Sequence, residues 1–179
     1  MKKLIMYCAV LGSVGCASQI DGPAATARLI PTKGNVTSGI VTFQSMGAKV
    51  LVNAEIRGLK PNAEHGFHIH EKGDCSSGDG MSAGGHFNPT AKGHGAHGSN
   101  SHHAGDLPSL VADANGVAKL SFETSAISIG KASTDILGLG LIVHRDPDDF
   151  KTQPTGNSGP RLACAVIQKS QPGSMNYKY

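Results

Sequence analysis

The sequence has no tryptophan, and phenylalanine and tyrosine together make up only 4% of its 179 residues. It also lacks any stretch with a convincing helical hydrophobic period, and no segment repeats, which argues against a helical bundle and a repeat array. Glycine, in contrast, is abundant, with 24 residues. Few aromatic residues and many glycines favour a loop-rich β domain, and the length predicts a single one.

The sequence also lacks a large net charge. The formal net charge is +3, from 16 basic and 13 acidic residues. Lys2 and Lys3 lie in a leader segment described below, and without them 14 basic residues face 13 acidic ones, or +1. A nearly neutral chain without basic runs excludes nucleic acid as an expected partner. Electrostatic steering of any small ligand would have to come from local placement of charge.

The N-terminus has the pattern of an export signal over residues 1–15. Lys2 and Lys3 form a basic start, and Leu4 to Val14 is a short apolar run. This run is too short to span a bilayer as a permanent helix. We therefore expect a signal peptide and a mature protein in the periplasm.

Cys16 follows this leader directly and has two interpretations. In the first it is the lipid-modified cysteine of a bacterial lipoprotein, after the box Ser13-Val14-Gly15, where leucine would be usual in place of Ser13. In the second an ordinary signal peptidase cuts nearby, for example after Ala17. The motif favours the lipoprotein, which implies an anchor in the outer membrane.

Four cysteines are present, and only two of them belong to the expected domain. Cys8 leaves with the leader, and Cys16 is either lipidated or removed. Cys75 and Cys164 remain, and in an exported protein such a pair predicts a disulfide, although two buried free thiols are the alternative. A bridge across so long a loop would stabilise the fold by about 4 kcal/mol in the chain-entropy model.

Alternating apolar residues predict strands from Ala27 onward. The clearest case is residues 48–57, in which Val50, Val52, Ala54 and Ile56 share one face. Residues 16–26 are expected to be a tether, 27–170 the domain and 171–179 a tail. Further strands and turns are expected at residues 39–44, 66–70, 117–122 and 141–144 (strands) and at 58–62 and 113–116 (turns).

Two stretches without strand character, residues 71–105 and 145–160, are rich in glycine and polar residues. Loops this long in a compact domain are usually functional or disordered. Short strands with long functional loops predict an all-β fold, an antiparallel sandwich or flattened barrel.

The nine histidines are concentrated in and beside these loops. His68 and His70 are two apart on an expected strand, so their imidazoles point to the same side and can reach one metal ion. His144 ends another apolar strand and is placed to join the same centre. A second set consists of His86, His94, His97, His102, His103 and Asp106. Imidazoles with one carboxylate suit zinc or copper, although a His-rich metal-scavenging loop is the alternative for this second set alone.

The order of motifs resembles the copper/zinc superoxide dismutase family, in its bacterial form. The motifs are Gly66-Phe67-His68-Ile69-His70-Glu71, Gly73-Asp74-Cys75, Ser82-Ala83-Gly84-Gly85-His86-Phe87-Asn88-Pro89, His103-Ala104-Gly105-Asp106-Leu107, Val143-His144 and Gly159-Pro160-Arg161-Leu162-Ala163-Cys164. The resemblance covers nearly everything after the tether. It implies a Greek-key, immunoglobulin-like sandwich.

The resemblance also implies roles for individual residues. Copper would be bound by His68, His70, His86 and His144. Zinc would be bound by His86, His94, His103 and Asp106, with His86 bridging both metals. Asp148 would link a copper-ligand histidine to a zinc-ligand histidine, and Arg161 would attract superoxide beside the copper.

The implied activity is dismutation of superoxide to dioxygen and hydrogen peroxide, with catalysis by the copper, Arg161 and His86. The alternative is a periplasmic copper- or zinc-binding protein that uses the same fold without turnover. Both a monomer and a homodimer remain open. The sequence assigns no role to His97 and His102, and it indicates a structural or exposed position for His65.

Overall fold

The computed structural model describes residues 22–170. The expected signal peptide, the alternatives for Cys16 and the expected tail lie outside these residues. The described residues form ten strands and one short 3₁₀ helix: β1 (Ala24–Pro31), β2 (Ser38–Met46), β3 (Lys49–Arg57), β4 (Glu64–His65), β5 (Phe67–His70), η1 (Met81–Ala83), β6 (Leu110–Val111), β7 (Ala118–Thr124), β8 (Gly140–His144), β9 (Arg161–Val166) and β10 (Gln168–Lys169). In residues 22–170, no helix is long and apolar enough to cross a membrane.

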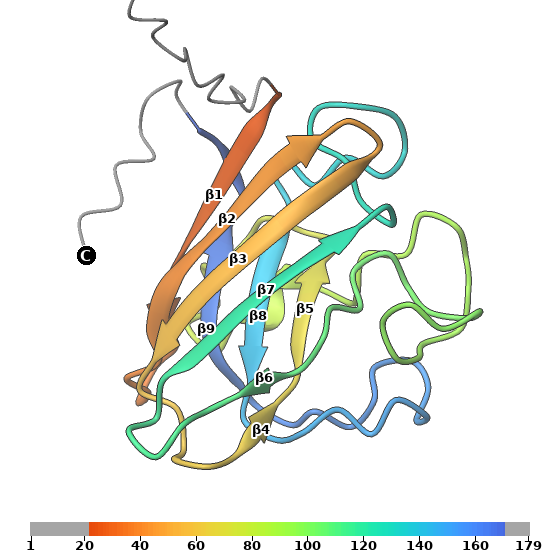
Figure 1. Cartoon of the computed structure of the whole chain (residues 1–179). Helices are drawn as coiled ribbons and strands as arrows, with labels where there is room; N and C mark the ends of the chain where they lie inside the picture. Colours follow the sequence, from red (N-terminus) through yellow and green to blue (C-terminus); the bar gives the residue numbers. More distant parts are fainter. Residues whose placement is uncertain (1–21, 171–179) are drawn as a thin grey trace, which may run out of the picture.

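The main sheet curls into two layers. Its strand order is β5-β8-β9-β1-β2-β3-β7, and β10 also pairs with β1. β1 pairs antiparallel with β2 over residues 24–29 and with β9 at Ile30 and Pro31, so one strand belongs to both layers. In Figure 1, β1, β2, β3 and β7 lie in front of β9, β8 and β5. The expected antiparallel sandwich or flattened barrel is therefore confirmed.

The core lies between these layers, and the alternation in β3 explains how it forms. Val50, Val52, Ala54 and Ile56 are buried, and the residues between them are less so. Side chains of a strand alternate between its faces, so one face of β3 packs inward while the other meets solvent. Phe43 on β2 and Phe67 on β5 are fully buried and join the same cluster from the two layers.

Several boundaries differ from the expectation. β1 begins at Ala24, inside the stretch expected to be a tether, because Ala24 and Ala25 pair with Gln44 and Phe43 of β2.

The turn at residues 113–116 is present, with the Gly116 amide donating to the Asp113 carbonyl at 3.0 Å. The strand that enters this turn, β6, pairs with β4. The strand that leaves it, β7, pairs with β3.

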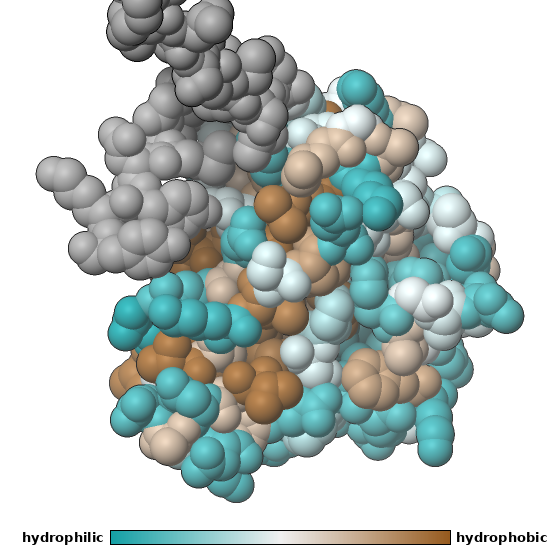
Figure 2. All heavy atoms as spheres, viewed as in Figure 1, coloured by the Kyte–Doolittle hydropathy of each residue, from teal (hydrophilic) through white to brown (hydrophobic). Residues whose placement is uncertain are grey.

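The outer face of the front layer is only partly polar. Figure 2 shows apolar side chains (brown) among polar ones (teal) on this face. Ile30 on β1 and Ile40 on β2 are 55% and 40% exposed. Together with Leu120 of β7 they line a shallow hollow in the surface.

The two long loops lie side by side at the edge of the barrel (Figure 1, green and blue). Gln153 joins them: its side-chain oxygen accepts the His94 amide at 2.8 Å, and its side-chain nitrogen donates to the His94 carbonyl at 3.0 Å. The expected disulfide is confirmed, and Cys75 and Cys164 fix the start of the first loop to β9. The site described next is built by these loops and the ends of β5 and β8.

Candidate metal centre

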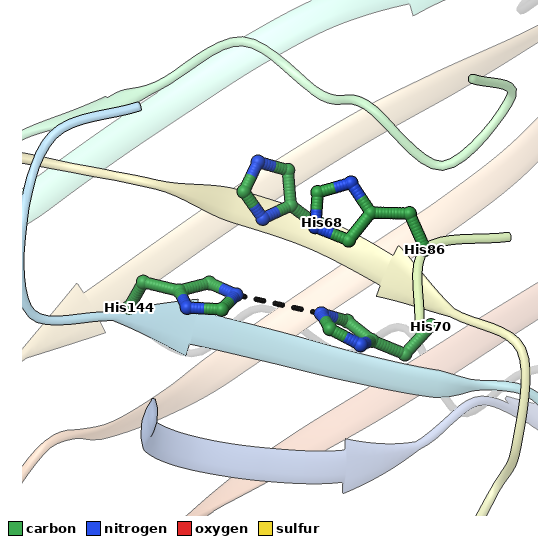
Figure 3. Close-up of side chains that lie close together, drawn as sticks. All are labelled: His68, His70, His86 and His144. Atoms are coloured by element: carbon green, nitrogen blue, oxygen red, sulfur yellow. Dashed lines mark hydrogen bonds between the residues drawn. The ribbon is translucent and has the colours of Figure 1, made fainter. Parts of the chain in front are cut away.

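Four histidines converge where β5 and β8 meet the first loop (Figure 3). His68 and His70 lie on β5, His144 ends β8, and His86 pairs with His70 through an isolated β-bridge. Each offers one ring nitrogen, and these four atoms lie within 4.8 Å of one another. The two-residue spacing on β5 therefore does bring His68 and His70 to a common point. All four side chains are buried.

Main-chain carbonyls set the orientation of two of these rings. His70 Nδ1 donates to the Gly84 carbonyl at 3.0 Å, and His144 Nδ1 donates to the Gly159 carbonyl at 3.1 Å. Because Nδ1 carries the proton in both rings, each Nε2 has a free lone pair. The two Nε2 atoms face each other across 3.4 Å, as the dashed line in Figure 3 shows.

A second group shares His86 with the first. It consists of His86, His94, His103 and Asp106, all buried, with one ligand atom from each within 4.8 Å of the others. Asp106 is its hub: Oδ1 lies 2.8 Å from His86 Nδ1, and Oδ2 lies 3.1 Å from His94 Nδ1. His86 thus uses Nδ1 in the second group and has Nε2 left for the first.

Asp148 links the two groups by a hydrogen bond to one histidine of each. Its Oδ2 accepts from His68 Nε2 at 2.6 Å, and its Oδ1 accepts from His94 Nε2 at 2.9 Å. Both rings therefore present Nδ1 to their centres. Gly156, with φ 65°, packs so closely here that a Cβ atom would overlap the Asp148 carboxylate and the His94 ring. The second loop must carry glycine at this position.

Buried ring nitrogens without hydrogen-bond partners show that the two groups fit metal ions. In residues 22–170 these atoms include His68 Nδ1, His86 Nε2, His94 Nδ1 and His103 Nδ1. A buried polar atom without a partner is costly, so such a set calls for an explanation. Four imidazoles suit copper, and three imidazoles with one carboxylate suit zinc.

Burial keeps three imidazoles of the first group, those of His68, His70 and His144, neutral at pH 7. Burial lowers the pKa of His68 to about 4, although its hydrogen bond with Asp148 opposes the shift. Burial also holds the pKa values of His70 and His144 well below the usual range, and nearby positive charge, including that of Arg161, adds to this. Neutral imidazole is the form that binds a metal ion.

The second group is charged. Burial opposes ionisation of Asp106, but the hydrogen bond from His86, the adjacent His94 ring and the hydrogen bond from the His103 amide hold its pKa far below the usual range. Burial likewise opposes the charged form of His94, but Asp106 and Asp148 raise its pKa to about 9. The ionised Asp106 carboxylate can therefore bind a cation in the second group.

Arg161 lies beside the first group. It pairs with His144 across β8 and β9. Its Nη1 and Nη2 donate to the carbonyls of Gly80 at 2.6 Å and Gly84 at 2.7 Å. These acceptors are neutral, and no carboxylate in residues 22–170 forms an ion pair with Arg161. Its guanidinium is therefore held in place without an ion pair, although the charge of Asp79 acts on it from a distance.

Sequence reasoning missed the groups that orient these side chains. They are the Gly80, Gly84 and Gly159 carbonyls and the Gln153 side chain. Main-chain carbonyls leave no signal in a sequence, whatever residue carries them. His65 is buried, and its Nδ1 donates to the His144 carbonyl at 2.9 Å, which fits the structural role expected for it.

These features define a class of protein: an antiparallel β-sandwich with two adjoining groups of metal-ligating side chains that have one histidine in common. The family model for copper/zinc superoxide dismutase (SODC) matches residues 37–167. The superoxide dismutase [Cu-Zn] of Paramecium bursaria Chlorella virus 1 is 44% identical over 72% of this chain and 71% of its own. Superoxide dismutase [Cu-Zn] 1 of Aquifex aeolicus is 36% identical over 90% of this chain and 95% of its own. The crystal structure of the clock protein EA4 has a TM-score of 0.74 and 39% identity over 81% of this chain and 93% of its own.

The chain belongs to the copper/zinc superoxide dismutase family. It is an oxidoreductase that converts superoxide to dioxygen and hydrogen peroxide, with copper and zinc as cofactors.

Proposed function

We propose that His68, His70, His86 and His144 hold the copper and that His86, His94, His103 and Asp106 hold the zinc. The observation that carries this assignment is the position of His86. Its Nδ1 lies 2.8 Å from Asp106 Oδ1 in the second group, and its unpartnered Nε2 belongs to the first. One imidazole ring therefore separates two centres of different composition, all-nitrogen on one side and nitrogen with carboxylate on the other.

The different ligands of the two sites imply different roles for copper and zinc. Copper supplies one-electron redox chemistry for both halves of the dismutation, whereas zinc supplies charge without redox change. His86 Nε2, which has no hydrogen-bond partner, is proposed to accept a proton during turnover. Asp148 and the Gly84 and Gly159 carbonyls keep the other rings in the tautomers that ligation requires.

Arg161 is proposed to attract and orient the superoxide anion. The Gly80 and Gly84 carbonyls hold its guanidinium in place, and its charge is not paired with a carboxylate. The net charge without the two leader lysines is only +1, so attraction of an anion depends on such local charge. The rate of encounter should therefore fall as salt is added.

Activity distinguishes this function from the alternative, a metal-binding protein without turnover. The retention of Arg161 and of every expected ligand position favours the enzyme. The test is metal analysis of the purified protein together with a superoxide consumption assay. We expect activity that requires copper and is abolished in His144→Ala. A protein that holds both metals and consumes no superoxide would support the alternative.

We also propose that the protein is exported to the periplasm and anchored to the outer membrane through lipid on Cys16. The support is the pattern of the first 16 residues: two lysines, a short apolar run and a small residue before the cysteine. Mass spectrometry of the mature protein tests both parts. Diacylglycerol on an N-terminal Cys16 is expected, and an unmodified N-terminus beyond Cys16 would reject the anchor.

For the quaternary structure we propose that the protein is a monomer or a homodimer. In a homodimer, the exposed Ile30 and Ile40 on the front layer would be candidate contact residues. Light scattering on the mature protein, with Ile40→Lys as the variant, tests the proposal. A monomeric mass for the wild type would reject the homodimer.

A further inference from the structure

Two histidines of the first loop take no part in either metal group. His97 and His102 lie between His94 and His103, and both side chains are half-buried. Their ring centroids are 5.6 Å apart and the rings are inclined by 71°. The family relationship and the dismutase reaction leave this pair unexplained.

The spacing of this pair is the spacing of metal ligands in the same molecule. His70 and His144 in the first group, and His94 and His103 in the second, also have ring centroids 5.6 Å apart. A centroid distance of 5.6 Å therefore leaves room for one ion that both rings can reach.

The protonation of both rings also suits a ligand. His97 Nδ1 donates to the Asp106 carbonyl at 2.9 Å, and His102 Nδ1 donates to the Ser99 carbonyl at 2.8 Å. With the proton on Nδ1, each Nε2 has a free lone pair. Within residues 22–170 neither Nε2 has a hydrogen-bond partner. The same arrangement, Nδ1 on a carbonyl and Nε2 free, is found in His70 and His144.

His97 is held in place before any ion arrives. Its ring packs edge-on against Phe122 of β7, with the centroids 5.1 Å apart, and its Nδ1 is tied to the Asp106 main chain. His102 is anchored within the turn that contains Ser99. Fixed rings lose little freedom on binding, so both side chains are preorganised.

We propose that His97 and His102 form a third metal site, which takes a divalent ion of the zinc and copper class through their Nε2 atoms. Imidazole nitrogens suit these ions, whereas magnesium and calcium require oxygen ligands. Water completes the coordination, because neither metal group contributes a ligand here. Two protein ligands bind more weakly than four, so the site fills after the other two, and copper(II) binds it more tightly than zinc.

The test uses the mature protein already loaded with copper and zinc. Zinc ions are titrated in by calorimetry, and metal is counted by mass spectrometry after removal of free ion. The variants are His102→Ala and His97→Gln, and Asn100→Ala is the matched control, because Asn100 lies in the same loop without an imidazole. Retention of the two resident metals, measured first, shows that each variant is folded.

We expect the wild type and Asn100→Ala to bind one further zinc ion, and both histidine variants to bind it about tenfold or more weakly. Copper(II) in place of zinc should add a second electron paramagnetic resonance signal with coupling to two nitrogens, and that signal should be lost in the variants. A wild type that takes up no third ion would overturn the proposal, as would binding of the third ion by His102→Ala and His97→Gln that is as tight as in the wild type. Neither result depends on dismutase activity, so the assignment of the first two sites is tested separately.

Discussion

Replacement of Asp148 by asparagine keeps the size of the side chain but removes the carboxylate that links the two histidine groups. The Asp148 carboxylate accepts three hydrogen bonds, from His68 Nε2 at 2.6 Å, from His94 Nε2 at 2.9 Å and from the Phe150 amide at 2.7 Å. Asparagine has one acceptor oxygen, and its nitrogen would face a ring N–H that also donates. One histidine must then lose this partner or change its tautomer, which withdraws Nδ1 from its metal centre.

The magnitude follows from the bond that is lost. A hydrogen bond to a charged group contributes about 1.5–3 kcal/mol. This corresponds to zinc affinity lower by about tenfold to a hundredfold, which is the usual effect of losing a group that orients a metal-bound histidine. Because the side chain keeps its volume and the core is not altered, we expect the fold to persist.

Competition with a zinc chelator measures this loss in purified Asp148→Asn. Asp149→Asn is the matched control, because Asp149 is the next residue of the same loop and its oxygens bond only to Lys151 and Thr152. We expect the control to keep the zinc affinity of the wild type. If Asp148→Asn retained zinc as firmly as the wild type, the assigned role of Asp148 would be wrong.

Three further predictions concern rate, pH and stability. Arg161→Ala should keep its copper but consume superoxide more slowly at low salt, by about tenfold or more; unchanged stopped-flow kinetics would refute the guiding role. His94, whose pKa is about 9, is protonated below that pH in the metal-free fold, so zinc binding must release its proton. Calorimetry in buffers of different ionisation enthalpy should show this release, with affinity rising up to about pH 9, and pH-independent affinity would contradict it. The pKa of His94 is higher in the folded chain, about 9, than its ordinary value of 6.5. Protonated His94 therefore stabilises the metal-free fold fully below pH 6.5, and this contribution is lost as the pH approaches 9. Replacement of Cys75 and Cys164 by serine should lower the free energy of unfolding by about 4 kcal/mol in denaturant titrations, and an unchanged midpoint would show that the bridge does not constrain the unfolded chain.

Much of the fold could be read from the sequence where one face of a strand is buried. β3 is the clearest example, since Val50, Val52, Ala54 and Ile56 alternate with more polar residues. β9 gives no such signal. Its sequence, RLACAV, has small residues on both faces, and three consecutive residues, Ala163 to Ala165, are buried. Periodicity identifies a strand only when its two faces meet different surroundings.

Pairing between distant strands is harder to predict than the strands themselves. The turn motif at residues 113–116 is typical of a β-hairpin, but the strand before it, β6, has only two residues and pairs with β4, not with β7. A turn motif specifies the local bend, whereas the choice of partner depends on the curl of the whole sheet.

The site was predictable as far as its side chains carry chemistry. Histidines and Asp106 stand out in the sequence, and the order of motifs brought them together. The groups that orient them did not stand out, because the Gly84 and Gly159 carbonyls belong to the main chain and Gln153 resembles any surface glutamine. Their contribution depends on positions that only the folded loops define.

The central claim is that His86 lies between two different metal ions. Anomalous diffraction from crystals of the metal-loaded protein, measured at the copper and zinc absorption edges, tests it most directly. We predict a copper peak beside His86 Nε2, within reach of His68, His70 and His144, and a zinc peak beside His86 Nδ1, within reach of Asp106. A single peak at His86, or copper and zinc in positions that share no residue, would contradict the account.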